Sequence, residues 1–514
     1  MRALRSIRYR RELALGCLVS LAVHATLGVR SLTVLDRLFL PDDTYYTLTI
    51  ARNIARGIGP SADGILLTSG FQPLLAFFLV PSFLFELDQQ VPVYLAIFLG
   101  GVCGVVNTGL IGCWVAARTH SPGTTLAATL FAACAPVLVK NDLNGLETSL
   151  ATALALCCVL AAGQARRTGA LRWAAVTGCC AGLAMLARVD NAFVVGLVGL
   201  WCARGLPPRA TGVLVGSALG CVLPWWGYAL LTFGTVVPES GPAVRQIVAF
   251  HQSLHLTTAA AVHKAITALG RLVGASGGLP AKMIAGGILL AMADPLRRSL
   301  RAKRVDETTL LGVAGIAFLL FYTFYLPAFW FFERYFYFVY VCAIGCAAAA
   351  LCRVGRALRG FAYGRMVAAA VAGGLILANV LSLIPLRSSP AGTLFAGDEG
   401  ARGYGEVARE VLGWVPSGAT VSAMQSGALG YYAPRSIRVL NLDGVVNRDA
   451  RRALGERGLY AYLASSGVDY FADWDINVLM LLMHSGAPEP RAILSPLRRM
   501  KPQGRDRFTL FRVH

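Results

Sequence analysis

Two adjacent carboxylates, Asp42 and Asp43, follow the first apolar segment of the chain and precede a Thr-Tyr-Tyr run at 44–46. Because neighbouring carboxylates repel each other, we expect at least one of them to have a raised pKa or a cationic partner. A carboxylate at such a boundary can remove the proton from a hydroxyl group that attacks a second substrate. The alternative is structural, since Asp also caps helix N-termini well and residues 44–57 follow a helical pattern.

Further charged residues lie where other apolar segments end. Glu147 begins the segment 146–163 and is the best second carboxylate, although the helix dipole alone favours a Glu at that place. Cations near such ends can take up negative charge that develops during a reaction. Arg334 stands out within the aromatic run 325–340, where a charge is costly and often functional. An ion pair with Glu333 or a snorkelling side chain is its structural alternative. The other candidate cations are Lys140, Arg188 and, in the first loop, Arg52.

Histidines and cysteines give no metal or disulfide pattern. His251 and His255 share a helical face, but neither an HExxH motif nor a carboxylate ligand accompanies them or His263. We therefore expect no metal site there and prefer a solvated helix. All 13 cysteines lie in or at the ends of apolar segments, where they act as small apolar residues.

Composition places these residues in a membrane protein. The 514 residues are 56% hydrophobic and 14% charged, whereas soluble domains carry about a quarter charged residues. Repeated apolar stretches of roughly 15 to 25 residues predict membrane-spanning helices. The net charge of +20 comes from basic residues in short segments between apolar runs, which is the pattern that orients a membrane protein. We therefore expect no nucleic-acid partner.

The apolar segments predict eleven spans, with the N-terminus inside and the C-terminus outside. The short run 73–87 is treated as re-entrant or interfacial, because this choice puts every strongly basic short loop inside. The first outside loop, 30–90, is unusually long, and long ordered loops tend to be functional. The predicted spans are 13–29, 91–117, 124–139, 146–163, 173–187, 191–203, 210–233, 278–293, 308–327, 335–352 and 366–386.

The composition changes at about residue 387. Residues 387–514 contain no cysteine and no spanning segment, and apolar runs alternate there with helical patterns. This predicts a small α/β domain outside the membrane. A Rossmann nucleotide site is not expected, because no GxGxxG motif opens a helix after a strand. The strand-like runs are 420–424, 468–472 and 508–513, and the helical patterns are at 402–413 and 449–465.

The run PDDTYYTLTIARNIARGIGPSADGILLTSGFQPLL, residues 41–75, resembles the first periplasmic loop of the GT-C superfamily of membrane glycosyltransferases. The resemblance is to the bacterial branch related to protein mannosyltransferases, aminoarabinose transferases and arabinofuranosyltransferases. That branch has an acidic pair after its first helix, a Tyr-rich helix, and a membrane-dipping segment that opens as Phe71-Gln72-Pro73 does here. Weaker similarities follow in the expected order at 144–148, 187–191, 233–238, 334–335 and 427–447.

Two positions depart from the pattern of this family. Ser69 stands where Asn is common, and Glu239-Ser240 stands where Asn-Thr is common. These departures leave the choice of sugar and the detail of the loops open.

The resemblance implies a polytopic α-helical protein with a GT-C fold over 1–386 and a periplasmic α/β domain over 387–514. It implies a polyprenyl-phosphate sugar donor, an inverting displacement at the anomeric carbon and an Asp that activates the acceptor. Here that Asp is Asp43 or Asp42, with Glu147 as a second carboxylate. We expect Arg334, Arg188, Lys140 and Arg52 to bind the donor phosphate, and Tyr45, Tyr46 and Gln72 to contact the acceptor or the loop.

The expected setting is the inner membrane of a bacterium, with the N-terminus in the cytoplasm and the C-terminal domain in the periplasm. The acceptor is an envelope lipid, polysaccharide or protein, and membrane lipid surrounds the spans. Some members of the family use a divalent cation and many do not, so the cofactor stays open. The main alternative is a flippase or binding protein for lipid-linked glycans. A flippase should hold charges along a central pathway, whereas the polar residues here gather at the outer ends of the spans.

Overall fold

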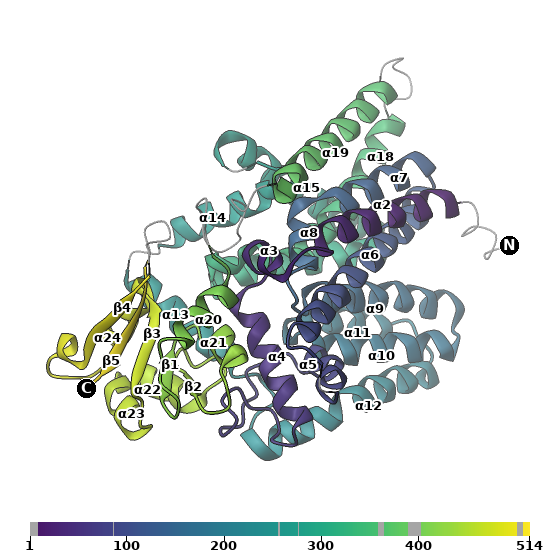
Figure 1. Ribbon diagram of the computed structural model, residues 1–514. Helices are drawn as coiled ribbons and strands as arrows, with labels where there is room; N and C mark the ends of the chain where they lie inside the picture. Colours follow the sequence, from purple (N-terminus) through teal and green to yellow (C-terminus); the bar gives the residue numbers. More distant parts are fainter. Residues whose placement is uncertain are drawn as a thin grey trace.

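The computed structural model describes residues 9–85, 87–254, 257–275, 277–357, 364–388, 402–500 and 507–514. Figure 1 shows a large bundle of helices on one side and a small sheet with the C-terminus on the other, with α4 between them. Within the described residues, seven helices are long and apolar enough to cross a membrane, and an eighth span results if a bent pair of helices counts as one. The chain is a multi-pass membrane protein.

The long helices coincide with predicted spans. They are α2 (Arg10–Gly28), α6 (Val91–Thr119), α9 (Thr148–Thr168), α12 (Pro208–Phe233), α15 (Gly278–Ala302), α16 (Glu307–Leu320) with the π-turn η4 (Phe321–Tyr325), and α18 (Tyr337–Ala357). The other predicted spans also form helices, namely α7 (Pro122–Cys134) with α8 (Pro136–Asp142), α10 (Leu171–Ala187), α11 (Ala192–Ala203) and α19 (Gly364–Ser388). The total of eleven spans stays a prediction.

The predicted span 124–139 is broken between α7 and α8, which are bent by 58°. Ala135 is extended there, because the residue before a proline avoids the helical region and Pro136 follows. The break redirects the chain and lets α8 end at Asp142, beside the start of α9. It thereby brings Asn141 and Asn144 to the edge of the bundle that faces the first loop.

Short helices form the connections on that edge. The first loop contains α3 (Leu32–Leu38), α4 (Asp42–Ala55), α5 (Pro73–Leu79) and η1 (Val80–Phe83). The run 73–83 is too short to cross a membrane as a helix, and its place as a re-entrant or interfacial segment stays a prediction. The other connections contain η2 (Val189–Asn191), α13 (Ser240–Ser253), α14 (Thr258–Gly270), η3 (Arg271–Val273), η5 (Phe329–Phe331) and α17 (Phe332–Tyr335).

A hydrogen-bonded polar cluster lies inside the helix bundle. His24 Nε2 lies 2.9 Å from Asp142 Oδ2, and His24 Nδ1 lies 2.7 Å from the Ser20 carbonyl oxygen. Tyr337 donates to Asp142 Oδ1 at 2.6 Å, and Asn107 donates to the Tyr337 hydroxyl at 3.2 Å. These five residues are buried, so their bonds connect α2, α6, α8 and α18 where no water compensates a lost partner.

The C-terminal region forms a five-stranded sheet with the order β2-β1-β3-β5-β4. Strand β1 runs parallel to β2 and β3, while β5 runs antiparallel to β3 and β4. The predicted strand runs are found as β1, β3 and β5. Bounds are β1 (Thr420–Ala423), β2 (Arg438–Asn441), β3 (Tyr470–Trp474), β4 (Leu494–Arg499) and β5 (Phe508–Val513). The helices are α20 (Tyr404–Leu412), α21 (Gly427–Tyr432), α22 (Arg448–Gly455), α23 (Leu459–Ser465), α24 (Asp475–Met483) and η8 (Pro490–Ile493).

The sheet and the first loop share one buried apolar cluster. It joins residues of α3 and α4, such as Leu35 and Leu48, to residues of α20, β1 and β5, such as Val411, Val421 and Leu510. Burial of this kind contributes about 25 cal/mol per Å² of apolar surface. The C-terminal region is therefore packed against α3 and α4 as part of the same core, which fixes its position relative to the first loop.

Candidate active site

Asp42 lies at the start of α4 and binds the N-terminal end of α21. Its Oδ2 accepts from the Gly427 N–H at 2.7 Å, and its Oδ1 accepts from the Ala428 N–H at 2.8 Å. A side chain on Gly427 would overlap the Asp42 backbone, so glycine is required for this close approach. Burial outweighs the two hydrogen bonds and raises the pKa of Asp42 to about 7. Both oxygens of Asp42 are thus engaged by the C-terminal region.

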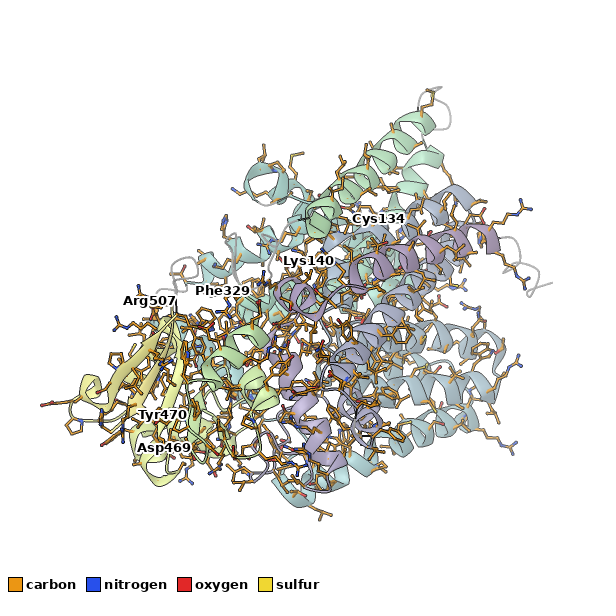
Figure 2. The ribbon with its side chains drawn as sticks, viewed as in Figure 1. Cys134, Lys140, Phe329, Asp469, Tyr470 and Arg507 are labelled. Atoms are coloured by element: carbon orange, nitrogen blue, oxygen red, sulfur yellow. The ribbon has the colours of Figure 1, made fainter. Side chains whose placement is uncertain are left out.

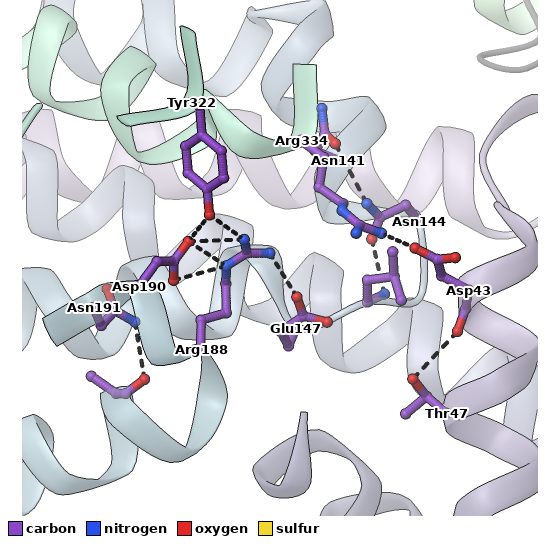
Figure 3. Close-up of polar contacts among 12 residues, drawn as sticks. Asp43, Thr47, Asn141, Asn144, Glu147, Arg188, Asp190, Asn191, Tyr322 and Arg334 are labelled. Carbon is purple, nitrogen blue, oxygen red and sulfur yellow. Dashed lines mark hydrogen bonds and ion pairs between the residues drawn. The ribbon is translucent and has the colours of Figure 1, made fainter. Parts of the chain in front are cut away.

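Asp43 faces the helix bundle and pairs with Arg334, as Figure 3 shows. Arg334 Nη1 donates to Asp43 Oδ2 at 2.7 Å, and the Asp43 side chain keeps 29% of its surface exposed. Neighbouring residues on a helix point about 100° apart, which explains why Asp42 and Asp43 have different partners. The Arg334 guanidinium lies over the rings of Phe331 and Tyr335, and its Nε is buried without a hydrogen-bond partner.

The alternative partner considered for Arg334, Glu333, binds Arg271 instead. Because Arg271 lies in η3 and Glu333 in α17, this second ion pair fastens α17 to the end of α14. It leaves the Arg334 guanidinium to Asp43.

Glu147 belongs to a buried network centred on Arg188. Arg188 Nη1 donates to Glu147 at 2.8 Å, and Arg188 Nη2 donates to Asp190 at 2.9 Å and to the Tyr322 hydroxyl at 3.0 Å. Tyr322 in turn donates to Asp190. The guanidinium therefore lies between two carboxylates, and the guanidinium groups of Arg188 and Arg334 both lie over the Tyr335 ring. This network can orient Tyr335 and the neighbouring Arg334 from behind.

A cavity of about 450 Å³ opens beside the Asp43–Arg334 pair. Buried Asn141 and Asn144 line its inner part, and the aromatic connection 329–332 lines one wall. Lys264 and Arg271 contribute cations at its exposed rim, and Arg334 contributes one deeper inside. With Glu333 as the acidic residue in its lining, the cavity carries an excess of positive charge. Cations, amides and aromatic rings in one cavity suit a phosphate attached to a sugar.

The remaining predicted residues lie around the Asp43–Arg334 pair. Figure 2 labels Lys140 and Phe329 among the side chains of the whole chain. Arg52 donates to the carbonyls of Tyr431 at 2.7 Å and Gly430 at 2.9 Å, at the C-terminal end of α21. Lys140 lies half-buried on α8 outside the lining of the cavity, and Gln72 precedes α5. Of the predicted cations, Arg334 lines the cavity; Arg188 touches the smaller space behind it.

Both predicted tyrosines are buried against the C-terminal region. Tyr45 donates to Asp36 at 2.7 Å, and the Tyr46 hydroxyl donates to the Met424 carbonyl at 3.1 Å. Tyr46 also accepts from Asn441 at 2.9 Å. The two side chains therefore contact the loop and the sheet in the described structure.

The carboxyl ends of the parallel strands β1 and β2 face α4. The turn after β2 holds Asp443, whose Oδ1 accepts from the Val445 N–H at 2.8 Å, and it packs so closely on Gly70 that a side chain there would overlap the Val445 carbonyl. Burial raises the pKa of Asp443 to about 8, with the charges of Asp43 and Asp42 adding to the rise. The C-terminal region thus places a further carboxyl group beside the acidic pair.

The described residues contain no group of three or more His, Cys, Asp or Glu side chains that could hold a metal ion. The His251 ring contacts the Trp330 ring at 4.5 Å between ring centres and is tilted by 45°, His263 lines the cavity, and His255 lies outside the described residues. All the cysteines of the chain are free.

The cations Lys264 and Arg271 were not predicted from the sequence. Both lie on the segment AVHKAITALGRLV, seven positions apart and hence on one helical face. This spacing was the signal in the sequence by which the two cations could have been found. Nothing local in the sequence pairs this face with the aromatic connection 329–332, which completes the cavity from a distant part of the chain.

The fold is that of the GT-C membrane glycosyltransferases. The chain matches ArnT, the aminoarabinose transferase, from Cupriavidus metallidurans bound to undecaprenyl phosphate, with a TM-score of 0.56 and 14% identity over 98% of both chains. The apo form of that protein matches with a TM-score of 0.54 and 15% identity over 97% of both chains. The arabinofuranosyltransferase AftD from Mycobacteria has a TM-score of 0.48 and 16% identity, covering 98% of this chain and 41% of that chain.

Sequence comparison adds one family to these structures. Residues 395–509 match a family described as a domain of unknown function (DUF8728), which covers most of the C-terminal region. No curated protein matches the sequence.

Proposed function

We propose that the protein is a glycosyltransferase that moves a sugar from a polyprenyl-phosphate donor to an envelope acceptor. The observation that carries this proposal is the Asp43–Arg334 pair at a cation-lined cavity in a GT-C fold. A carboxylate beside a phosphate-binding cation provides a base and a leaving-group partner in one place. The similar ArnT structure binds undecaprenyl phosphate, which supports the same class of donor here.

Asp43 is the proposed base. Its side chain is partly exposed next to the cavity, whereas Asp42 is buried with both oxygens bound by N–H groups. Asp43 would take the proton of the acceptor hydroxyl while that oxygen attacks the anomeric carbon and the polyprenyl phosphate leaves. Attack opposite to the leaving group inverts the configuration at that carbon.

Arg334, Lys264 and Arg271 are the proposed partners of the donor phosphate. Arginine matches the geometry of a phosphate with two parallel N–H bonds, and lysine adds a point charge. Asn141 and Asn144 would hydrogen-bond the sugar, and the rings of Phe329 and Trp330 would cover its apolar face. Glu147 and Arg188 act in this proposal by holding Tyr335 and Arg334 in place.

The proposed location is the inner membrane of a bacterium, with the cavity and the C-terminal region on the periplasmic side. The pattern of basic loops supports this orientation. The acceptor is a lipid, a polysaccharide or a protein of the envelope, and the C-terminal region, which lies beside Asp43 through its Asp443 turn, would contribute to its binding.

Mass spectrometry of envelope glycans and glycoproteins tests the proposal. A strain without the protein should lose one sugar, and the native protein should restore it. Asp43→Asn should insert normally and fail to restore it. Asp63→Asn, which removes another Asp–Arg pair of the same loop, is the matched control and should restore it. Full restoration by Asp43→Asn would favour a flippase or scaffold, since neither needs a base.

A further inference from the structure

Two groups compete for the guanidinium of Arg334, namely the Asp43 carboxylate and the proposed donor phosphate. In the described structure Nη1 is bound to Asp43 at 2.7 Å, and the same side chain lines the cavity proposed for the donor. A phosphate that is gripped by two parallel N–H bonds requires an edge of the guanidinium that includes Nη1 or Nε. Nε is buried, so the accessible edge is the one that Asp43 already occupies.

The Asp43-bound arrangement leaves one donor unsatisfied. The Nε atom of Arg334 is buried and makes no hydrogen bond, which costs free energy in any interior site. The aromatic rings of Phe331 and Tyr335 hold the plane of the guanidinium without bonding its edge. Arg188, in contrast, is held by hydrogen bonds to Glu147, Asp190 and Tyr322. The looser bonding of Arg334 is what we expect of an arginine that changes partner.

We infer that Arg334 is transferred from Asp43 to the donor phosphate when the donor binds, so that donor binding releases the base. This inference rests on the proposed function. While the donor is absent, Asp43 Oδ2 accepts from Arg334, so that only Oδ1 is open to an acceptor hydroxyl. Once the phosphate has taken Nη1, Asp43 Oδ2 is free to receive a proton. The exchange favours an order in which the donor binds before the acceptor is activated, because it frees the second carboxylate oxygen.

The exchange predicts that Asp43 weakens donor binding through Arg334. The test measures binding of undecaprenyl phosphate to the purified full-length protein in detergent, without sugar or acceptor. Asp43→Asn should tighten binding about three- to tenfold, the scale of one lost competing interaction. Arg334→Gln should weaken binding, and Lys264 and Arg271 should keep the weakened binding measurable.

A double-mutant cycle separates the exchange from simple charge removal. Asp43→Asn removes a negative charge, so by itself it could favour an anion without involving Arg334. If the inference is right, Asp43→Asn tightens binding in the native background and has no effect in the Arg334→Gln background. Asp63→Asn, which breaks the Asp63–Arg438 pair of 2.7 Å, should leave binding unchanged in both.

Three results would overturn the inference. Equal tightening by Asp43→Asn in both backgrounds would reduce the effect to charge, and unchanged or weaker binding in the native background would exclude competition. Failure of undecaprenyl phosphate to bind the native protein would instead remove the proposed donor site, and the exchange with it. The first two results leave the proposed function standing, so the two failures are distinguishable.

Discussion

Asp42 and Arg52 bind opposite ends of the same short helix, α21, from two places on α4. Asp42 accepts from the N–H groups of Gly427 and Ala428, and Arg52 donates to the carbonyls of Gly430 and Tyr431. Negative charge at the N-terminus and positive charge at the C-terminus is the arrangement that the peptide dipoles of a helix favour. The two side chains thus anchor the C-terminal region to the first loop.

Asp42→Asn should lower the stability of the protein, whereas Asp43→Asn should lower its transfer rate. The side-chain amide that Asp42→Asn introduces would point an N–H at one of the two backbone N–H donors, so we expect a loss of about 1–3 kcal/mol of stability. Asp43→Asn should melt as the native protein does, while turnover falls on the order of 10²- to 10⁴-fold. Thermal unfolding in detergent and transfer rates measure both effects. Equal destabilisation by the two substitutions would contradict the separate roles.

Stability should fall as the pH rises through the weakly acidic range. Burial raises the pKa of Asp36 to about 6, of Asp42 to about 7 and of Asp443 to about 8, all above the ordinary value of 3.8. Between about pH 4 and pH 8 the folded state therefore binds more protons than the unfolded state, and the free energy of unfolding decreases with rising pH. The melting temperature should be higher at pH 5 than at pH 8. Asp443→Asn should flatten the upper part of this range; a melting temperature that increases with pH would exclude the explanation.

Lys264→Gln should impair use of the donor. Lys264 is exposed at the rim of the cavity, where solvent screens its charge, so we expect the KM for the donor to rise about three- to tenfold with little change in kcat. Lys282→Gln, at an exposed position of α15 outside the cavity, is the control. An unchanged KM in the Lys264 variant would remove this residue from the donor site.

Removing one member of the His24–Asp142 pair should destabilise the protein more than replacing both members with apolar residues. Asp142→Ala removes the carboxylate that bonds His24 Nε2 and accepts from the Tyr337 hydroxyl, and breaking such a buried pair costs about 3–5 kcal/mol. His24→Leu combined with Asp142→Leu should recover part of this loss, because the two buried polar partners are then removed together. Melting temperatures of the single and double variants test this. A double variant that melts below both single variants would contradict the pairwise explanation.

Several features could be predicted because they depend on local sequence. Arg334 could be identified as a costly charge in an aromatic run, and the strands β1, β3 and β5 could be located from apolar runs. Strand β4 was missed because it carries exposed and basic residues such as Arg498 and Arg499, which are typical of a sheet edge. The break at Ala135 also had a local signal in Pro136, although the apolar run appeared continuous.

Other features depend on contacts between distant parts of the chain. The acidic pair gave no reason to prefer Asp43, because the difference comes from α21 on one side and α17 on the other. The same holds for Arg52, whose partners are the carbonyls of Gly430 and Tyr431. Residue type marked both carboxylates, but the three-dimensional packing determines that Asp42 is buried and that Asp43 stays partly exposed.

The sheet order has a consequence for when the site can form during synthesis. Strand β5 at 508–513 pairs between β3 and β4, and the sheet it completes supports the contacts of Asp42 with Gly427 and Ala428. Contacts between residues so far apart in sequence close late, because a long loop must first be ordered. A chain still emerging from the ribosome therefore has its helices before it has a docked first loop. The contacts between α4 and α21 would be complete only after strand β5, which begins at Phe508, has joined the sheet.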